Sequence, residues 1–184
     1  FDIWYVQRNS QNDNWSEPIN MGEPVNTEYN EFYPSVAANQ NIYFTSNALG
    51  TRGKDDIFFS EWRNGSYSTP VALSDSINTE GYEFNAFVAN NESYLIFSGY
   101  NREDGLGSGD MYISYRIDNN KWTQARNLGV GLNSESMDYC PTVVESTNTL
   151  YFTSKRSTIQ HKKFESMEAF KNEEERIVFI IGGG

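Results

Sequence analysis

The chain has 184 residues and carries 14 Lys and Arg against 25 Asp and Glu, so its formal net charge at pH 7 is −11. This balance argues against a general nucleic-acid binder and against docking on an anionic membrane surface, because both need clustered positive charge. Aromatic residues make up 15% of the chain, which is too many for a disordered acidic tail. The length is that of one domain of ordinary size.

The first residues, 1–6, already have the composition of a strand. We therefore expect further sequence upstream, and we find no signal peptide in this chain. The longest apolar run, 177–181, is strand-sized and falls short of the roughly 18–20 residues that span a bilayer. Cys140 is the only cysteine, so no intrachain disulfide can form. Its apolar surroundings predict a small buried hydrophobe rather than a reactive thiol.

Five short sequence words recur in the same order along the chain. The word at 2–5 returns at 56–59 and again at 110–113, each time 54 residues later. The other four words each occur three times as well, and their first copies are Trp15–Pro18, Val25–Glu28, Glu31–Val36 and Ile42–Ser46. Such self-similarity at a fixed period is the signature of a repeat architecture.

Each repeat predicts four short strands. In the copy that begins at Glu31, the expected elements are strand 31–36, an Asn-rich turn at 39–41, strand 42–46, a Gly-rich loop at 49–53, strand 56–59, a polar turn at 63–66 and a strand that contains Tyr67. No helix intervenes, and the pattern returns about every 50 residues. We therefore expect an all-β chain that forms four-stranded antiparallel blades of a β-propeller.

The same words resemble the WD40-like (PD40) repeat, a family related to the propeller of TolB and common in exported proteins of Bacteroidetes-type bacteria. The resemblance covers about residues 1–156 and rests on Trp-Ser-x-Pro-x-Asn, Val-Asn-Thr-Glu, Glu-x-x-Pro-x-Val, Leu-Tyr-Phe-Thr-Ser and Asp-Ile-aromatic. Ala86 and Ala125 depart from it, since each replaces a proline. The resemblance implies a TolB-like propeller in a protein that is exported, periplasmic or at the cell surface of a bacterium, but it specifies no ligand.

We expect one partial propeller over residues 1–181, with repeats at about 1–30, 31–82, 83–137 and 138–181. This makes about three and a quarter blades, whereas propellers usually close with about four to eight. Either the chain is a fragment of a larger propeller, which we favour, or another domain or chain completes it. Beyond Arg156 the pattern changes. There we expect a short helix within 161–175, a last strand at 176–180 and a flexible tail at 182–184.

The sequence contains no recognisable catalytic constellation. His161 is the only histidine, which excludes a multi-histidine metal site, and it lies in a charged tail. Phosphate-binding and calcium-binding loop motifs are absent. We therefore expect no cofactor and no metal, and the lack of a catalytic set of residues favours a protein that is not an enzyme.

Carboxylates recur in the loop that leads to the first strand of each repeat. One set is Glu28, Glu80 and Glu135, and the next is Glu31, Glu83 and Asp138. They form either a ring of acids that binds a cation or a basic partner, or a set of caps that accept hydrogen bonds from the backbone of their own loops. The repetition favours the caps, because an active site seldom needs one copy per blade.

The Gly-rich loops are expected on the same face, where scaffolds usually hold function. Glycans or peptides would meet Tyr33, Tyr82 or Tyr100 there. The arginines of these loops either contact a ligand or pair with the acids between blades. The candidate binding residues are Glu31, Glu83, Asp138, Arg52, Arg102, Arg156 and Tyr33. We expect the loop glycines to serve backbone geometry, and Trp15, Tyr67 and Trp122 to pack between blades.

Three functions remain open. The first is a non-enzymatic binding or scaffold propeller of the bacterial cell envelope that presents one loop face to a protein, peptide or glycan. The alternative is a propeller-type glycan hydrolase or lyase, which needs two channel carboxylates roughly 5–9.5 Å apart for hydrolysis. Only Glu31, Glu83 and Asp138 are plausible donors, and the idea fails if they are bonded to their own loops. The third function is a structural spacer.

Overall fold

The computed structural model describes residues 1–118, 121–156, 166 and 168. Within this part of the chain the regular elements are antiparallel strands and a 3-10 turn, η1 (Glu145–Thr147). The expected all-β class is therefore confirmed. The helix expected within 161–175, the last strand at 176–180 and the tail at 182–184 lie outside the described residues, apart from Ser166 and Glu168.

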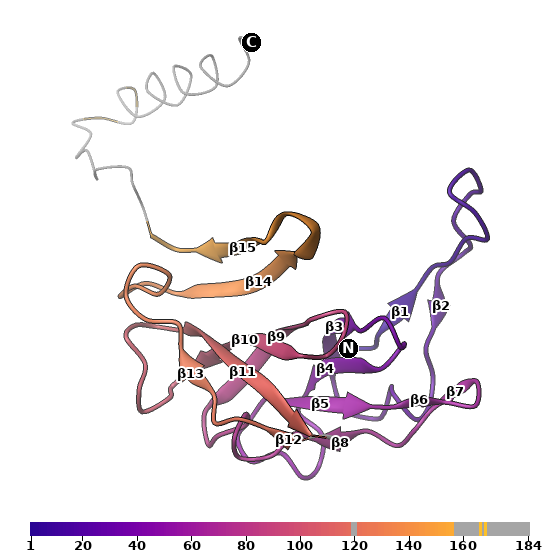
Figure 1. The fold of residues 1–184 in the computed structure, drawn as a ribbon, viewed down its shortest axis with the longest axis horizontal. Coiled ribbons are helices and arrows are strands. Elements are labelled where there is room, and N and C mark those ends of the chain that lie inside the picture. Colours follow the sequence, from indigo (N-terminus) through magenta and orange to yellow (C-terminus); the bar gives the residue numbers. More distant parts are fainter. Residues whose placement is uncertain (119–120, 157–165, 167, 169–184) are drawn as a thin grey trace.

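Sheets follow one another along the chain (Figure 1). The first pairs β1 (Trp4–Tyr5) with β2 (Ile19–Asn20). The second contains β3 (Glu31–Val36), β4 (Ile42–Ser46), β5 (Asp56–Ser60) and β8 (Val71–Ala72), with a small hairpin of β6 (Trp62–Arg63) and β7 (Ser66–Tyr67) beside it. The third contains β9 (Tyr82–Val88), β10 (Tyr94–Tyr100), β11 (Asp110–Asp118), β12 (Lys121–Trp122) and β13 (Arg126–Asn127). The fourth pairs β14 (Asp138–Val144) with β15 (Thr149–Ser154).

The outer strand of the second and third sheets differs from the expectation. Tyr67 lies in the β6–β7 hairpin, and the strand that pairs with β5 is β8, which begins after Pro70. A serine hydroxyl explains the break in both sheets. Ser60 donates to the Ser68 carbonyl at 2.5 Å, and Ser114 donates to the Thr123 carbonyl at 2.6 Å. The side chain replaces a backbone donor of the ladder, so the outer strand is split into two pieces.

The first strands of the three repeats, β3, β9 and β14, lie side by side, with β9 in contact with both of the others. Each strand carries the same irregularity. The pairing register shifts two residues after the buried acid, where Tyr33, Asn85 and Cys140 have φ of 55°, 53° and 53°. An extra residue in the left-handed region is typical of a β-bulge, which bends the strand and increases its twist.

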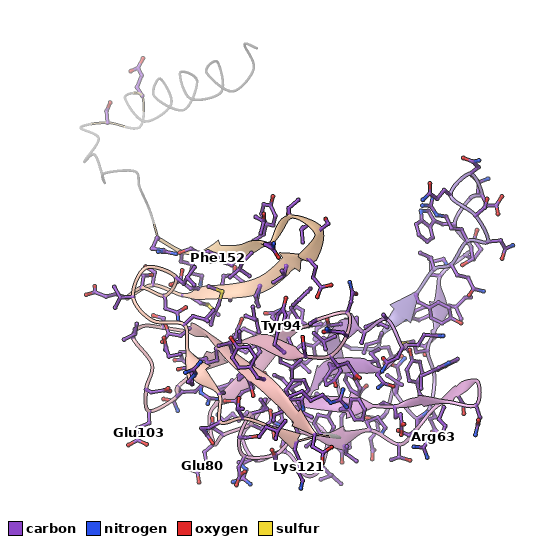
Figure 2. The ribbon with its side chains drawn as sticks, in the orientation of Figure 1. Arg63, Glu80, Tyr94, Glu103, Lys121 and Phe152 are labelled. Carbon is purple, nitrogen blue, oxygen red and sulfur yellow. The ribbon has the colours of Figure 1, made fainter. Side chains whose placement is uncertain are left out.

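The main core lies between the second and third sheets. Its buried side chains include Tyr43, Phe59, Phe97 and Tyr112, and a smaller cluster joins the first sheet to the second around Ile3 and Phe44. Figure 2 shows that charged side chains such as Glu80 and Glu103 lie at the outside of the molecule. Aromatic and β-branched side chains therefore fill the space between the sheets, as the composition predicts.

Adjacent repeats are tied together at one end of the strands. In each repeat the backbone N–H of the buried acid donates to a carbonyl that precedes the third strand of the sheet before it. These bonds join Glu31 to Phe1, Glu83 to Asp55 and Asp138 to Gly109, at 2.8 to 2.9 Å. The Gly-rich loop of one sheet thus lies against the Asn-Thr-Glu loop of the next.

Candidate functional site

The three repeated acids on the first strands are buried and cap their own loops. Glu83 is representative: one carboxylate oxygen accepts from the backbone N–H of Thr79 at 2.8 Å, and the other accepts from the Thr79 hydroxyl at 2.6 Å. Glu31 is held in the same way by Thr27, and Asp138 by Ser134. The geometry shows that these three carboxylates cap their own loops, as the second interpretation of the repeated acids expects.

The environments of these acids shift their pKa values in different directions. Burial raises the pKa of Glu83, and this effect outweighs the hydrogen bonds from Thr79 and the charge of Arg102. Burial acts on Asp138 as well, but hydrogen bonds from Ser154 and Ser134 and the charge of Arg156 outweigh it, so the pKa of Asp138 lies below its usual range. The acid at this repeated position thus has a raised pKa in one repeat and a lowered pKa in another, because its hydrogen-bond and charge partners differ.

The loop arginines pair mostly within their own sheet rather than between sheets. Arg102 forms a buried salt bridge with Glu83 at 2.8 Å and also donates to the Ile77 carbonyl. Arg156 lies 3.1 Å from Asp138. Each of these arginines thus pairs with the buried acid of its own repeat, and the guanidinium group that makes this contact is already occupied there. Arg52 differs, since it is exposed and lies 3.7 Å from Asp75.

Buried asparagines explain a second part of the repeated words. Asn78 accepts from the backbone N–H of Ile57 at 2.9 Å and donates to the carbonyls of Ile57 and Leu73. Asn26 and Asn133 do the same for the backbones of Ile3 and Met111. Each amide takes the place of a neighbouring strand at the start of the third strand. The Asn of the Asn-Thr-Glu word is therefore structural.

Glu92 is a buried acid that the sequence analysis did not single out. It lies in the turn before β10 and accepts hydrogen bonds from Asn41, Tyr43 and Arg116, and one from Asn39. Burial alone would raise its pKa, but these four donors outweigh burial and lower it. Glu92 thus joins the turn of its repeat to the second strand of the repeat before it, and both of its carboxylate oxygens accept hydrogen bonds within the protein.

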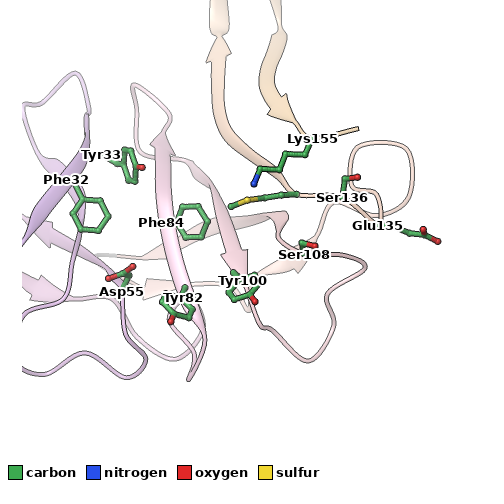
Figure 3. Close-up of a pocket in the computed structure, with 11 residues that line it drawn as sticks. Phe32, Tyr33, Asp55, Tyr82, Phe84, Tyr100, Ser108, Glu135, Ser136 and Lys155 are labelled. Atoms are coloured by element: carbon green, nitrogen blue, oxygen red, sulfur yellow. The ribbon is translucent and has the colours of Figure 1, made fainter. Parts of the chain in front are cut away.

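The clearest hollow lies at the loop end of the first strands. It encloses about 650 Å³ between residues of three repeats. Its lining residues, which we call the tyrosine pocket, are Phe32, Tyr33, Asp55, Tyr82, Phe84, Tyr100, Ser108, Glu135, Ser136, Met137 and Lys155. Figure 3 shows the lining side chains, with the rings of Phe84, Tyr82 and Tyr100 between Asp55 on one side and Lys155 on the other, and with Glu135 at the far edge.

The rings of the pocket form a partly exposed apolar wall. The ring centroids of Tyr82 and Tyr100 are 5.6 Å apart, and Tyr100 and Tyr33 keep 45% and 48% of their surface exposed. The charged lining residues are Asp55, Glu135 and Lys155. Burial, together with the charge of neighbouring Asp56, raises the pKa of Asp55. The pocket therefore suits a ligand with an apolar face and a few polar groups at its edge.

Some pocket positions differ between the repeats, although Phe32 and Phe84 are equivalent and Glu135 recurs as Glu28 and Glu80. Tyr82 precedes the buried acid of its repeat, and the equivalent residues are Asn30 and Met137. Tyr100 pairs with Tyr82 across the strands, and its equivalent in the last repeat is Lys155. The buried acids and asparagines shared by all repeats serve the fold, as shown above. The variable positions around the tyrosine pocket are free to serve recognition.

Of the seven residues expected to form a binding face, only Tyr33 lines this pocket. The tyrosines named beside it, Tyr82 and Tyr100, line the pocket too. Asp55, Phe84 and Lys155 were missed. The signal of Asp55 and Lys155 in the sequence is weak, because it consists only of a difference from the equivalent residues of other repeats, and Phe84 is the same residue as its equivalent Phe32.

Three further expectations have mixed outcomes. Trp122 is buried between the second and third sheets, with its ring 6.1 Å from that of Tyr43, as expected. Trp15 is 58% exposed and lies under the Arg8 guanidinium, so the expectation that it packs between blades is wrong here. Cys140 is half-buried rather than buried, because the bulge turns it toward the surface. His161 lies outside the described residues.

No protein-family model matches the chain, and no curated protein matches it either. In the described part of the chain, no helix has the length and apolar character needed to cross a membrane. The same residues contain no group of three or more His, Cys, Asp or Glu side chains arranged to hold a metal ion.

Proposed function

We propose that the chain is part of a β-propeller built from WD40-like (PD40) repeats. In this proposal it is a non-enzymatic binding domain of the bacterial cell envelope that takes a protein, peptide or glycan in the tyrosine pocket. The propeller is supported by the recurrence of the same words, bulges and capping bonds in successive sheets whose first strands are neighbours. The location in the envelope rests on the repeat resemblance alone.

The observation that carries the binding role is the tyrosine pocket itself. Its aromatic wall is exposed at the end where loops of three repeats meet, and the buried acids beneath it are occupied by their own loops. Aromatic rings bury large areas against the apolar faces of sugars and peptides, and their hydroxyl groups bind polar atoms at the edge. A binding site is favoured over a catalytic one because the three repeated acids, on which the hydrolase alternative depended, are held by their own loops.

The test is a titration of the purified chain with soluble peptidoglycan fragments that carry both sugar and peptide, followed by each part alone. Binding is measured by calorimetry and by NMR shifts. We expect Tyr100→Ala to weaken binding about tenfold or more, as is typical for loss of an aromatic anchor. Tyr115→Ala is the matched control, because Tyr115 is 43% exposed, also belongs to the third sheet and lies outside the pocket.

Equal effects of the two substitutions, or NMR shifts confined to residues outside the tyrosine pocket, would contradict the site. If no peptidoglycan fragment binds, an envelope extract is passed over the immobilised chain and its Tyr100→Ala variant. A protein retained by both forms equally argues against the pocket. Release of cleaved sugar during the titration would contradict a non-enzymatic role.

A further inference from the structure

The first and last sheets of the described chain each have an open edge. In complete sheets the second strand pairs on both sides, as β4 does with β3 and β5. Among the described residues, β15 pairs only with β14, and β1 pairs only with β2. Tyr151 of β15 is 60% exposed, whereas Tyr43 at the same position of β4 is fully buried. Trp4 of β1 is 57% exposed, whereas its equivalent Phe58 is 5% exposed.

The two open edges are complementary in sequence. β15 is a second strand of the repeat, and β1 is a third strand, and these two kinds of strand pair in both complete sheets. The register is the same in both: Ser46 lies opposite Asp56, and Gly99 lies opposite Asp110. Applied to the open edges, this register places Ser154 opposite Asp2 and Tyr151 opposite Tyr5.

A hollow beside β1 lies on the side of the sheet toward which this pairing would direct Tyr151. It encloses about 510 Å³ and is lined by Tyr5, Gln40, Ile42, Tyr67 and other residues of the first and second sheets. In the complete pair of sheets, the equivalent space is filled by Tyr43. Its hydroxyl donates to Glu92, and its ring lies 5.0 Å from Phe59 and 6.1 Å from Trp122.

The residues around the hollow are the repeat equivalents of those that surround Tyr43. Gln40 corresponds to Glu92, with φ of 71° and 57° at the two turns. Tyr5 corresponds to Phe59, and Tyr67 corresponds to Trp122. Tyr151 has the side chain and the strand position of Tyr43, so it fits the hollow when β15 lies beside β1.

We infer that a second copy of this chain supplies that strand: β15 of one copy pairs with β1 of the other, and Tyr151 enters the hollow beside Tyr5. The inference rests on the proposed propeller. The described residues of each copy form two complete sheets and two half-sheets, which together make three blades. Head-to-tail contacts close into a ring when the rotation allows it. Two copies make six blades, within the usual range of about four to eight, and three copies exceed it.

The first test is the mass of the full 184-residue chain in solution, by light scattering over a concentration series. We expect twice the 21.1 kDa of one chain. A monomer at all concentrations overturns the inference, and it is the outcome expected if residues 176–180 of the same chain pair with β15. A species larger than a dimer overturns the closed ring of two.

The second test is a charge exchange across the expected pair. Tyr5→Lys and Tyr151→Glu each place a charge in an apolar contact, and we expect each variant alone to raise the dimer dissociation constant about thirtyfold or more. Mixing the two variants creates one native contact and one Lys–Glu pair, and opposite charges stabilise a cross-strand pair. We expect the mixture to form dimers again.

Failure of the mixture to dimerise overturns the pairing of β1 with β15. Leu49→Glu is the control, because Leu49 is 81% exposed and lies away from both edges. Dissociation of this control as readily as the edge variants would also overturn the inference. Tyr5 and Tyr151 are 42% and 60% exposed, so folding of each variant is checked by circular dichroism. Neither residue lines the tyrosine pocket, so ligand binding by the monomeric variants tests the proposed function separately.

Discussion

The hydroxyl of Tyr43 donates a 2.8 Å hydrogen bond to the buried carboxylate of Glu92, 49 residues later in the chain. This bond joins the second strand of one repeat to the turn of the next. Burial and the charge of Glu92 raise the pKa of Tyr43, so the phenol stays protonated and remains a donor at every physiological pH. The pair shows how neighbouring repeats are held together by polar groups inside an aromatic core.

Replacement of Glu92 by Ala is expected to destabilise the fold by about 2–4 kcal/mol. The substitution leaves the buried donors of Tyr43 and Asn41 without their acceptor, and the loss of a buried partner costs more than the net worth of the bonds. The measurement is the urea midpoint at pH 7. Glu103→Ala is the control, since Glu103 is exposed in the Gly-rich loop region and its loss leaves the midpoint unchanged.

The fold is expected to become less stable as the pH is lowered, partly because Glu92 becomes protonated. The pKa of Glu92 is lower in the folded chain than the unfolded value of about 4.3, so its ionised form stabilises the fold above that value. The contribution is lost as the pH falls from about 4.3 through the folded pKa. Glu92→Gln is therefore expected to lose less stability than the native chain between pH 7 and pH 3 in urea titrations. A parallel pH dependence in both proteins would contradict this assignment.

Gly53→Ala is expected to disrupt the contact between neighbouring repeats. A Cβ atom at Gly53 would lie 2.1 Å from the Gly81 carbonyl oxygen, so the backbone of one loop has to move. We expect a loss of more than about 2 kcal/mol in unfolding free energy, in the range of overpacking at a rigid site. Gly65→Ala is the comparison, because its Cβ would meet nothing within 4 Å and only its φ of +84° opposes it. If Gly53→Ala lowers the free energy of unfolding no more than Gly65→Ala does, the close contact between the two loops does not contribute to stability.

Asn78→Ala is expected to cost on the order of 3 kcal/mol, since it leaves the backbone N–H of Ile57 and two carbonyls buried without their partner. Amide hydrogen exchange should locate the effect at the start of β5. Asn14→Ala serves as the control, because Asn14 lies in an exposed loop. If β5 keeps its protection, the asparagine does not hold that strand.

Cys140 is expected to react slowly with a thiol reagent near pH 8. Burial raises the pKa of its thiol, so less of the reactive thiolate is present than in a free cysteine. The rate is measured by absorbance with the native chain and again in urea, where it should rise severalfold. A native rate equal to the unfolded one would place the thiol in open solvent.

The repeat could be predicted from the sequence because strand periodicity, turns and β-branched residues are local properties. The word Ile42–Ser46 became β4, and 56–59 fell within β5, as expected. The split outer strand was not predictable in this way. It depends on the Ser60 hydroxyl, which reaches Ser68 only once the strands are paired.

The candidate site was predicted only in part, for a related reason. Repetition identifies what every sheet needs, and the capping role of Glu83 was anticipated from it. Several residues of the proposed binding site are instead ones that differ between the repeats. Lys155 and Asp55 carried only a weak signal, because their place in the tyrosine pocket results from three repeats meeting at one end.

The amino-acid sequence by itself determined the strands, the turns and the period, because these follow from interactions between residues close in the chain. It also determined that the acids would be repeated, but it left two roles open for them. The tertiary structure decided between these roles, because only folding brings the Thr79 backbone and Arg102 to Glu83. It likewise decided which aromatic side chains are buried in the core and which line the exposed tyrosine pocket, since the alternating faces of a strand acquire an inside and an outside only when sheets pack.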